Sequence, residues 1–497
     1  MEKNKKSILK DKVFYLPIII LALYFIIRLI DQSKIMWIFP FDFTNDISSH
    51  MAKIFFLAKY GYHQLVPYWY NGYLLFKFYP PAWFYFTLPL YYLTKNVQIA
   101  TFISILLIYT IGFIFIYILG KQENISKIKR VAFFLFFFAN PLAIGHLLRV
   151  GRTPEMFAWL MMIPFIIIIF FYKKRTIDKK FFLLIPFYGL ILLSHQTVFI
   201  ISNTLLLSLI LIKRNKKELI KIILIIILTA ILTSFWWFPF VFNISESSII
   251  QPTYNFANRL LDFDKQLWVE NIISFFIPLT FLILFYFYWI GKKKSKKELM
   301  FFLPEIFIAI LFLFRLVSFI PLLNFIYPDV YNLFFIFISI FFILKTKFNK
   351  KIKKYIPLLL LSIIIVSSLF SIFYTPWFTK NTKLDQETIS VFPYIDNKFI
   401  TVGYDESYGK AFYSYAPIYY NLETPSGWSS QEINKNYLNK IKEIKIQFEK
   451  KDCKGFINVL KELNTTYVIA HDDNCNFLKD CDLKEKIKKE RVCLYYY

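Results

Sequence analysis

The fold class is determined by stretches such as Glu155-Met-Phe-Ala-Trp-Leu-Met-Met-Ile-Pro-Phe-Ile-Ile-Ile-Ile-Phe-Phe-Tyr172-Lys173-Lys174-Arg175. Its apolar part, residues 155–172, has about the length that an α-helix needs to cross roughly 30 Å of hydrocarbon. Because the bilayer interior holds no water, such a segment must satisfy its own backbone hydrogen bonds, which a helix does. The basic residues that follow are typical of a cytoplasmic loop. This stretch therefore predicts a membrane-spanning helix with its C-terminal end in the cytoplasm.

The same pattern recurs along the whole chain. Of its 497 residues 57% are hydrophobic, and the mean hydropathy is +0.48. About half of the 59 Lys and Arg residues fall in six clusters between apolar blocks: 1–12, 121–130, 173–180, 213–221, 292–297 and 345–354. The net charge of +26 therefore follows the positive-inside rule and does not indicate a nucleic-acid partner.

The basic clusters orient the predicted spans. With residues 1–12 in the cytoplasm, residues 13–30 form the first span and residues 31–96 form a first outer loop. Ten further spans follow: 97–119, 130–147, 155–172, 181–194, 196–212, 219–238, 270–290, 300–316, 330–345 and 355–374. About eleven transmembrane helices (10–13) place every basic cluster inside and the C-terminus outside. We predict a multi-pass plasma-membrane protein with a cytoplasmic N-terminus.

Two segments are less regular than the others. The apolar stretch Pro80–Leu93 is short and interrupted by prolines, so we predict a re-entrant or interfacial segment there. The block 181–212 has basic residues on both sides, so it must cross twice as a tight hairpin. His195 then lies near the outer surface, where it is either a ligand or a satisfied interior group.

The composition changes after residue 375, which divides the chain into a transmembrane domain, 1–375, and an extracellular soluble domain, 376–497. Strand patterns at 398–403 and 466–470 and a helical pattern at 456–463 predict a small α/β domain. It contains all four cysteines: Cys453, Cys475, Cys481 and Cys493. An even number in an exterior domain suggests disulfides, with four free thiols as the alternative, and the spacing lacks the CxxC pair of a zinc site.

The first outer loop contains the residues most typical of catalysis. Asp42, Asp46 and His50 are spaced i, i+4 and i+8, so an interfacial helix would place them on one face. A carboxylate beside apolar lipid has a raised pKa, which suits a general base. The alternative is an ordinary helix N-cap at Thr44 or Asn45. Further along, Trp69 and Tyr79 lie among glycines and a Pro-Pro pair, which indicates a shaped loop beyond simple interfacial anchoring.

A second cluster lies between two spans, at residues 146–155. Arg149 and Arg152 lie in a predicted exterior loop, where the positive-inside rule leads us to expect few basic residues. Their presence there therefore calls for a local explanation. Arginine binds phosphate in a planar, bidentate manner, which suggests an anionic lipid headgroup. Glu155 is either a helix cap or a second functional carboxylate, and the alternative for the cluster is an Arg–Glu surface pair.

The order of these motifs resembles a known family. The matching pieces are Asp46-x-x-x-His50, Gly61, Pro67-x-Trp69, Gly72, Tyr79-Pro-Pro81, Arg149-x-x-Arg152-x-x-Glu155, Leu193-Ser-His195 and Trp236-Trp237-x-Pro239. They look like the multi-spanning "6-pyruvoyl-tetrahydropterin synthase-related" membrane proteins, which belong with the GT-C type glycosyltransferases. The family name does not describe an activity of this chain, which lacks a soluble pterin-synthase domain and that enzyme's zinc-binding histidines.

The resemblance implies a GT-C helical bundle whose active site lies at the outer leaflet. It also implies a polyprenyl-phosphate sugar donor and a carboxylate in the first outer loop, which maps to Asp46, with Asp42 as the alternative. This sequence departs from its relatives at Pro328-Asp329-Val330-Tyr331, where they often have Pro-x-Arg. That departure puts a late substrate contact in doubt.

These observations predict an inverting glycosyltransferase at the outer face of the membrane. Asp46 would be the general base, and Arg149 and Arg152 would stabilise the leaving phosphate. Glu155 and His50 would orient the substrates, and the exterior domain would help select a glycan, lipid or protein acceptor. We assign no metal ligands and expect no cofactor, although a divalent metal is compatible with this chemistry. The alternatives are a lipid or polysaccharide transporter and a non-catalytic envelope protein that retained the fold.

Overall fold

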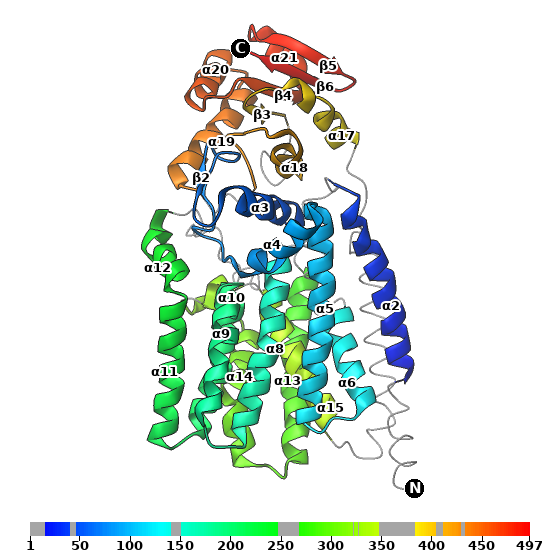
Figure 1. Ribbon diagram of the computed structural model, residues 1–497, viewed down its shortest axis with the longest axis vertical. Helices are drawn as coiled ribbons and strands as arrows, with labels where there is room; N and C mark the ends of the chain where they lie inside the picture. Colours follow the sequence, from blue (N-terminus) through cyan, green and yellow to red (C-terminus); the bar gives the residue numbers. More distant parts are fainter. Residues whose placement is uncertain are drawn as a thin grey trace. The chain divides into compact units, whose positions relative to one another are not determined.

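The computed structural model describes residues 15–39, 46–140, 151–246, 268–321, 323–326, 328–346, 383–403, 411–428 and 433–497. It consists mainly of helices, with a small sheet near the C-terminus (Figure 1). The chain divides into two compact units. We call Met1–Ile30, Ile105–Phe235 and Gln251–Pro376 the bundle unit, and Asp31–Ser104, Trp236–Ile250 and Trp377–Tyr497 the mixed unit. The predicted domain boundary at 375/376 lies outside the described residues.

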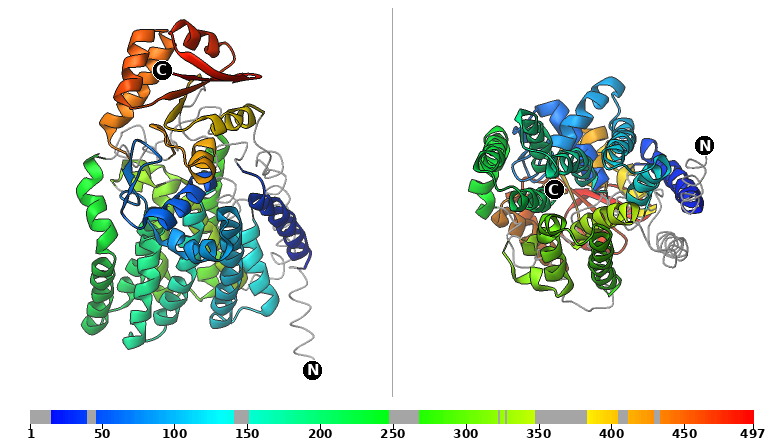
Figure 2. Two further views of the ribbon diagram at one scale, coloured as in Figure 1. Left: turned by 45° about the horizontal axis from the view of Figure 1, so that its top comes forward. Right: turned by 90° about the horizontal axis from the view of Figure 1, so that it is seen from below.

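The bundle unit is built from apolar helices that stand side by side (Figure 2). They are α2 (Tyr15–Ser33, up to Ile30), α5 (Val97–Gln122, from Ile105 onward), α6 (Lys127–Phe134), α8 (Thr153–Lys173), α9 (Leu184–Leu192), α10 (Gln196–Ile212), α11 (Lys216–Leu232), α13 (Trp268–Gly291), α14 (Lys296–Leu313) and α15 (Pro328–Lys345). Helix α8 packs against both α9 and α10, and nearly all of its residues are buried. It therefore lies in the interior of the bundle.

Five helices in the described part of the chain are long and apolar enough to cross a membrane. They are Tyr15–Met36, which includes α2 (Tyr15–Ser33), Val97–Gln122, Thr153–Lys173, Asn271–Gly291 and Pro328–Lys345. Helix α11 and α12 (Ser234–Asn243) make a sixth if the pair, bent by 75°, is one span. The predicted span 355–374 lies outside the described residues, so the count of eleven stays a prediction. Helix α4 (Ala82–Thr94), at 13 residues, is only about 20 Å long and is too short to cross.

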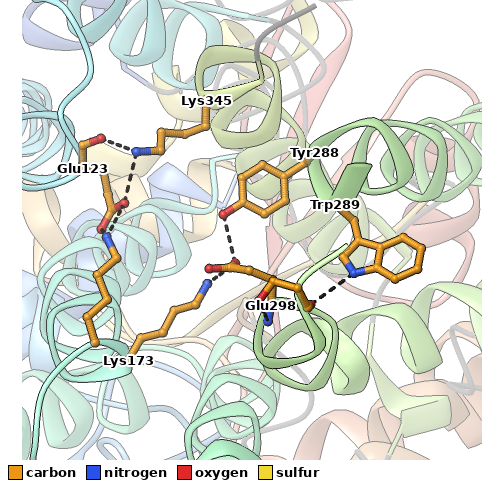
Figure 3. A network of polar contacts seen from close by, with 8 residues as sticks. Glu123, Lys173, Tyr288, Trp289, Glu298 and Lys345 are labelled. Atoms are coloured by element: carbon orange, nitrogen blue, oxygen red, sulfur yellow. Dashed lines mark hydrogen bonds and ion pairs between the residues drawn. The ribbon is translucent and has the colours of Figure 1, made fainter. Parts of the chain in front are cut away.

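Two lysines of the basic clusters, Lys173 and Lys345, are largely buried and paired with glutamates (Figure 3). Lys173 Nζ lies 2.5 Å from Glu298 Oε2, which also accepts a hydrogen bond of 3.0 Å from the hydroxyl of Tyr288. Lys345 lies 3.4 Å from Glu123 Oε2. Because a buried charge without a partner is costly, these pairs tie together the ends of α8, α13, α14 and α15 and the residues after α5.

In the mixed unit, the first outer loop forms α3 (Ile47–Tyr60), a short hairpin of β1 (Leu65–Val66) and β2 (Tyr73–Leu74), and α4. The C-terminal part forms α17 (Lys383–Ser390), β3 (Phe399–Thr401), α18 (Ala411–Tyr420), α19 (Lys435–Glu449), α20 (Cys453–Glu462), β4 (Tyr467–His471), α21 (Asn474–Asp480), β5 (Lys484–Lys489) and β6 (Val492–Tyr496). The sheet has the order β3-β4-β6-β5, with β3 parallel to β4 and the other pairs antiparallel. The predicted α/β domain, with strands β3 and β4 and helix α20, is confirmed.

The first outer loop and the C-terminal part are joined by backbone pairing. The amide of Thr424 donates to the carbonyl of Tyr68 at 2.9 Å, and the amide of Tyr70 donates to the carbonyl of Ser426 at 3.1 Å. Helix α18 also packs against α3. Two segments far apart in the sequence therefore form one structural unit.

All four cysteines are paired in two disulfides, Cys453–Cys481 and Cys475–Cys493. The first joins the start of α20 to the end of α21, and the second joins α21 to β6. The sequence left open whether the cysteines form disulfides or remain free thiols, and the structure shows disulfides. They are typical of proteins outside the cytoplasm.

The stability of the sheet domain is expected to depend on pH through His471. Its Nε2 lies 2.8 Å from Thr388 Oγ1, and burial lowers the pKa of His471 from 6.5 to about 4. The unfolded chain therefore binds more protons between these values, so stability falls as the pH drops from about 6.5 to 4. One pKa unit corresponds to roughly 1.4 kcal/mol, which gives a loss of about 3 kcal/mol.

Hydrogen exchange of β4 in the full chain, held in lipid nanodiscs and corrected for intrinsic rates, measures this loss. We expect His471→Asn to flatten the pH dependence over this range. An equal loss of protection in the variant and the native chain would show that other groups cause the effect.

Candidate active site

Asp46 occupies the N-cap position of α3 without acting as a side-chain cap. Its carbonyl accepts hydrogen bonds of 2.9 Å from the amide of His50 and from Ser49 Oγ. Its carboxylate makes no cap hydrogen bond, and Oδ1 instead accepts a 3.2 Å hydrogen bond from Trp428 Nε1. The N-cap alternative placed the cap at Thr44 or Asn45, which lie outside the described residues. The structure has Asp46 itself at the N-cap position, and its side chain contacts Trp428 and not the helix.

Trp428 comes from the C-terminal part of the chain and was not predicted. Trp428 is 6% exposed, and the segment before it pairs with the first outer loop through the hydrogen bond from the amide of Tyr70 to the carbonyl of Ser426. A Cβ on Gly427 would lie only 2.8 Å from Cβ and Cγ of Trp69, so only glycine fits there. Trp69 is itself fixed, because its Nε1 donates to the carbonyl of Tyr413 at 2.9 Å. Trp69 thus holds the segment that directs Trp428 toward Asp46.

His50 and Lys53 lie around the ring of Tyr79. The imidazole of His50 is buried, with its centroid 5.7 Å from the ring centroids of Tyr79 and of Trp83. Lys53 Nζ lies 4.1 Å from the centroid of the Tyr79 ring, and Lys53 has no exposed surface. The carbonyl of Tyr79 accepts a 3.1 Å hydrogen bond from the indole of Trp236. A buried lysine on α3 is a second residue that the sequence did not reveal.

In the bundle unit, Arg152, Glu155, His195 and Asp329 form one cluster. Arg152 Nη1 lies 2.6 Å from Asp329 Oδ2 and 3.5 Å from Glu155 Oε2. His195 Nε2 lies 3.6 Å from the same oxygen of Glu155, and its Nδ1 lies 2.7 Å from Thr197 Oγ1. The carboxylate of Glu155 has no exposed surface. The start of α8, the junction of α9 and α10 and the start of α15 supply these residues.

The unusual Pro328–Tyr331 stretch contributes Asp329 to this cluster. It lies in the first turn of α15 and forms the shortest ion pair with Arg152. Among the described residues of this cluster, the guanidinium of Arg152 faces two carboxyl groups, those of Asp329 and Glu155. Any anion that binds Arg152 must compete with Asp329.

The structure thus gathers the described candidates into two groups, one in each unit. The mixed unit holds Asp46, His50, Trp69 and Tyr79, and the bundle unit holds Arg152, Glu155 and His195. Asp42 and Arg149 lie outside the described residues. No group of three or more His, Cys, Asp or Glu side chains in the described ranges is arranged to hold a metal ion.

The sequence of this chain matches one family, described as "6-pyruvoyl-tetrahydropterin synthase related domain; membrane protein", over residues 76–375. No curated protein has a significantly similar sequence.

Several solved structures have a similar fold. The oligosaccharyltransferase of Archaeoglobus fulgidus, in a complex with Zn and sulfate, is 11% identical with a TM-score of 0.56, over 90% of this chain and 68% of that chain. The same organism's AglB, in a complex with an inhibitory peptide and a dolichol-phosphate, is 10% identical with a TM-score of 0.52, over 92% and 69%.

The arabinofuranosyltransferase AftD from Mycobacteria is 11% identical with a TM-score of 0.56, over 96% of this chain. This chain spans only 39% of the length of AftD. At such low identities the similarity shows the fold, which is that of the GT-C glycosyltransferases.

Proposed function

The chain belongs to the 6-pyruvoyl-tetrahydropterin synthase-related family of membrane proteins, and from this and its GT-C fold we propose that it is a membrane glycosyltransferase. The donor would be a polyprenyl-phosphate sugar and the acceptor a hydroxyl group of a glycan, lipid or protein. The observation that carries this proposal is the carboxylate of Asp46, which is directed toward the indole of Trp428 and not used as a helix cap. A fixed carboxylate in the first outer loop is what a general base requires.

In this mechanism Asp46 takes the proton from the acceptor hydroxyl. The hydroxyl oxygen attacks the anomeric carbon while the bond from that carbon to the phosphate oxygen breaks, and the lipid phosphate leaves with the electron pair. A single displacement inverts the anomeric configuration. The hydrogen bond from Trp428 Nε1 fixes the direction of the carboxylate, which favours proton transfer in one geometry.

The leaving phosphate needs a cation, because negative charge develops on it in the transition state. We assign this role to Arg152, with Arg149 as a second cation. The planar guanidinium of Arg152 already holds Asp329 at 2.6 Å, and the phosphate would take that place. Glu155 and His195 then keep the guanidinium oriented, and His50, Trp69 and Tyr79 shape the sugar or acceptor site. The structure of AglB with a dolichol-phosphate supports a lipid phosphate as the donor group.

We place the reaction at the outer face of the membrane, with the C-terminal part of the chain outside. The two disulfides support this placement, since thiols in the cytoplasm stay reduced. In chains taken directly from cells and alkylated without reductant, we expect all four cysteines to be protected. Alkylation of all four without reductant would contradict an exterior location.

The proposal is tested with the purified chain in nanodiscs and labelled polyprenyl-phosphate sugars. We expect release of the lipid phosphate together with transfer of the sugar to an added acceptor or, slowly, to water. The matched control is the double variant Asp46→Asn/Arg152→Ala, which should release neither. No turnover with any lipid-phosphate donor would contradict the proposal.

A lipid transporter is the second candidate, and one observation favours it. Glu305 has no exposed surface inside α14, and its Oε1 accepts a 2.7 Å hydrogen bond from Ser208 Oγ of α10. Ionisable groups inside a membrane bundle often mark transport pathways. A Glu305→Gln variant that loses lipid movement across vesicles but keeps sugar transfer would favour transport as a separate activity.

A further inference from the structure

We propose that the side-chain amide of Asn464, in the C-terminal part of the chain, is a site of N-glycosylation. The inference treats the chain as an acceptor of sugar and does not depend on its own proposed activity. The co-substrate is a lipid-linked oligosaccharide, and a separate membrane enzyme of the same cell transfers the sugar. The amide nitrogen bonds to the anomeric carbon and gives one proton to a base of that enzyme. The bond from the anomeric carbon to the lipid phosphate breaks, and the lipid phosphate leaves with the electron pair.

The chain contains three Asn-x-Ser/Thr sequons: Asn124-Ile-Ser126, Asn243-Ile-Ser245 and Asn464-Thr-Thr466. Such a sequon accepts an N-linked sugar where its asparagine is accessible outside the cytoplasm. Asn243 is the last residue of α12, and its Nδ2 donates a 2.7 Å hydrogen bond to the carbonyl of Pro239. Asn464 is exposed, and its side chain has no hydrogen bond within the described part of the chain. Its amide nitrogen is therefore the more accessible of the two.

The disulfides indicate that Asn464 lies in an oxidising compartment. Asn464 is in the turn between α20 and β4, inside the loop that the Cys453–Cys481 disulfide closes. Disulfides form and persist outside the cytoplasm, where secreted proteins carry N-linked sugars. The disulfide and the sequon are independent observations on the same segment, and both place it outside.

Asn124 has the same local structure as Asn464 and serves as an internal comparison. Both are exposed and have a left-handed backbone, with φ of 54° for Asn124 and 48° for Asn464. The amide of Asn464 donates to the carbonyl of Lys461, and the next amide donates to the carbonyl of Leu460, both at 3.0 Å. The same two hydrogen bonds around Asn124 measure 3.1 Å and 2.8 Å. Both sites are Schellman caps in which asparagine takes the position usual for glycine.

The two matched sequons differ in their predicted side of the membrane. Asn124 lies in the basic cluster 121–130, which the positive-inside rule assigns to the cytoplasm. Asn464 lies in the disulfide-bonded part of the chain. Because conformation and exposure are alike, the side of the membrane decides which of the two asparagines receives a sugar.

Peptide mass spectrometry of the full chain, isolated from the membranes of its native cells, tests the proposal. We expect the mass of an added sugar chain on Asn464 and none on Asn124 or Asn243. Thr466→Val should abolish this added mass, because the sequon requires a hydroxyl at its third position, and Thr466→Ser should keep it. Asn397→Ala is the matched control, since it removes only the 3.3 Å hydrogen bond from Asn397 Nδ2 to Thr466 Oγ1 and should leave the sugar in place. Asn464→Gly, which suits the left-handed backbone, should lose the sugar and keep both disulfides.

The outcomes separate this inference from the proposed activity of the chain. An unmodified Asn464, or a sugar that persists in Thr466→Val, would overturn the inference. A sugar on Asn124 and none on Asn464 would overturn it and would also reverse the predicted orientation. If Asn464 carries a sugar but the purified chain transfers none, the proposed function fails and the glycosylation site stands.

Discussion

Replacement of Asp46 by Asn is expected to lower the rate of sugar transfer by about 10²- to 10⁴-fold, the usual contribution of a general base. The amide has nearly the shape of the carboxylate and still accepts a hydrogen bond from Trp428 Nε1, but it cannot take a proton. The backbone contacts of Asp46 with Ser49 and His50 do not involve its side chain and are retained. Transfer rates in nanodiscs, with donor binding measured separately, give the result.

Two variants on the same contacts serve as controls. Ser49→Ala removes a side chain that binds only the carbonyl of Asp46, so it should transfer sugar at nearly the native rate. Trp428→Phe keeps an aromatic ring but removes the N–H, so we expect a smaller loss than with Asp46→Asn. Sugar transfer by Asp46→Asn at the native rate would show that Asp46 is not the general base.

Replacement of Arg152 by Met is expected to affect both stability and catalysis. The change leaves Asp329 and the buried Glu155 without their described cation, and breaking a buried ion pair costs about 3 kcal/mol or more. If Arg152 also stabilises the leaving phosphate, the rate of transfer falls by a further 10²- to 10³-fold or so. Thermal unfolding and transfer rates measure the two effects on one preparation.

The double variant Arg152→Met/Asp329→Asn separates these effects. Neutralising Asp329 removes one of the two carboxylates that Arg152 faces, so most of the lost stability should return. Transfer should stay low, because the cation that faces the phosphate is still missing. Recovery of both stability and transfer would show that Arg152 is purely structural.

The membrane class and the presence of a C-terminal α/β domain were predictable because their signals are local. A span is recognised from a run of apolar residues, a cytoplasmic loop from its charges, and strands β3 and β4 from short alternating patterns. A helix in the first outer loop was also predictable, since Asp46 and His50 have a helical spacing, and α3 begins at Ile47.

The contacts that define the candidate site were not predictable in this way. Trp428 lies 382 residues from the carboxylate of Asp46 to which it donates, and the only local sign was a Gly-Trp pair in a polar segment. Asp329 was noticed as a departure from a family pattern, but its contact with Arg152 joins residues 177 positions apart. The pairing of the four cysteines also remained open, because spacing does not specify which chain ends approach each other.

The sequence by itself therefore determined that this is a mainly helical membrane protein with a small C-terminal α/β domain, and it indicated which loop contains candidate catalytic residues. Only the tertiary structure decided which charge each carboxylate faces and that Lys53, one of 59 basic residues, is fully buried. The physical reason is that helix formation and hydropathy depend on neighbours in the chain. Burial and ion pairing depend on which segments fold against each other, and no local pattern carries that information.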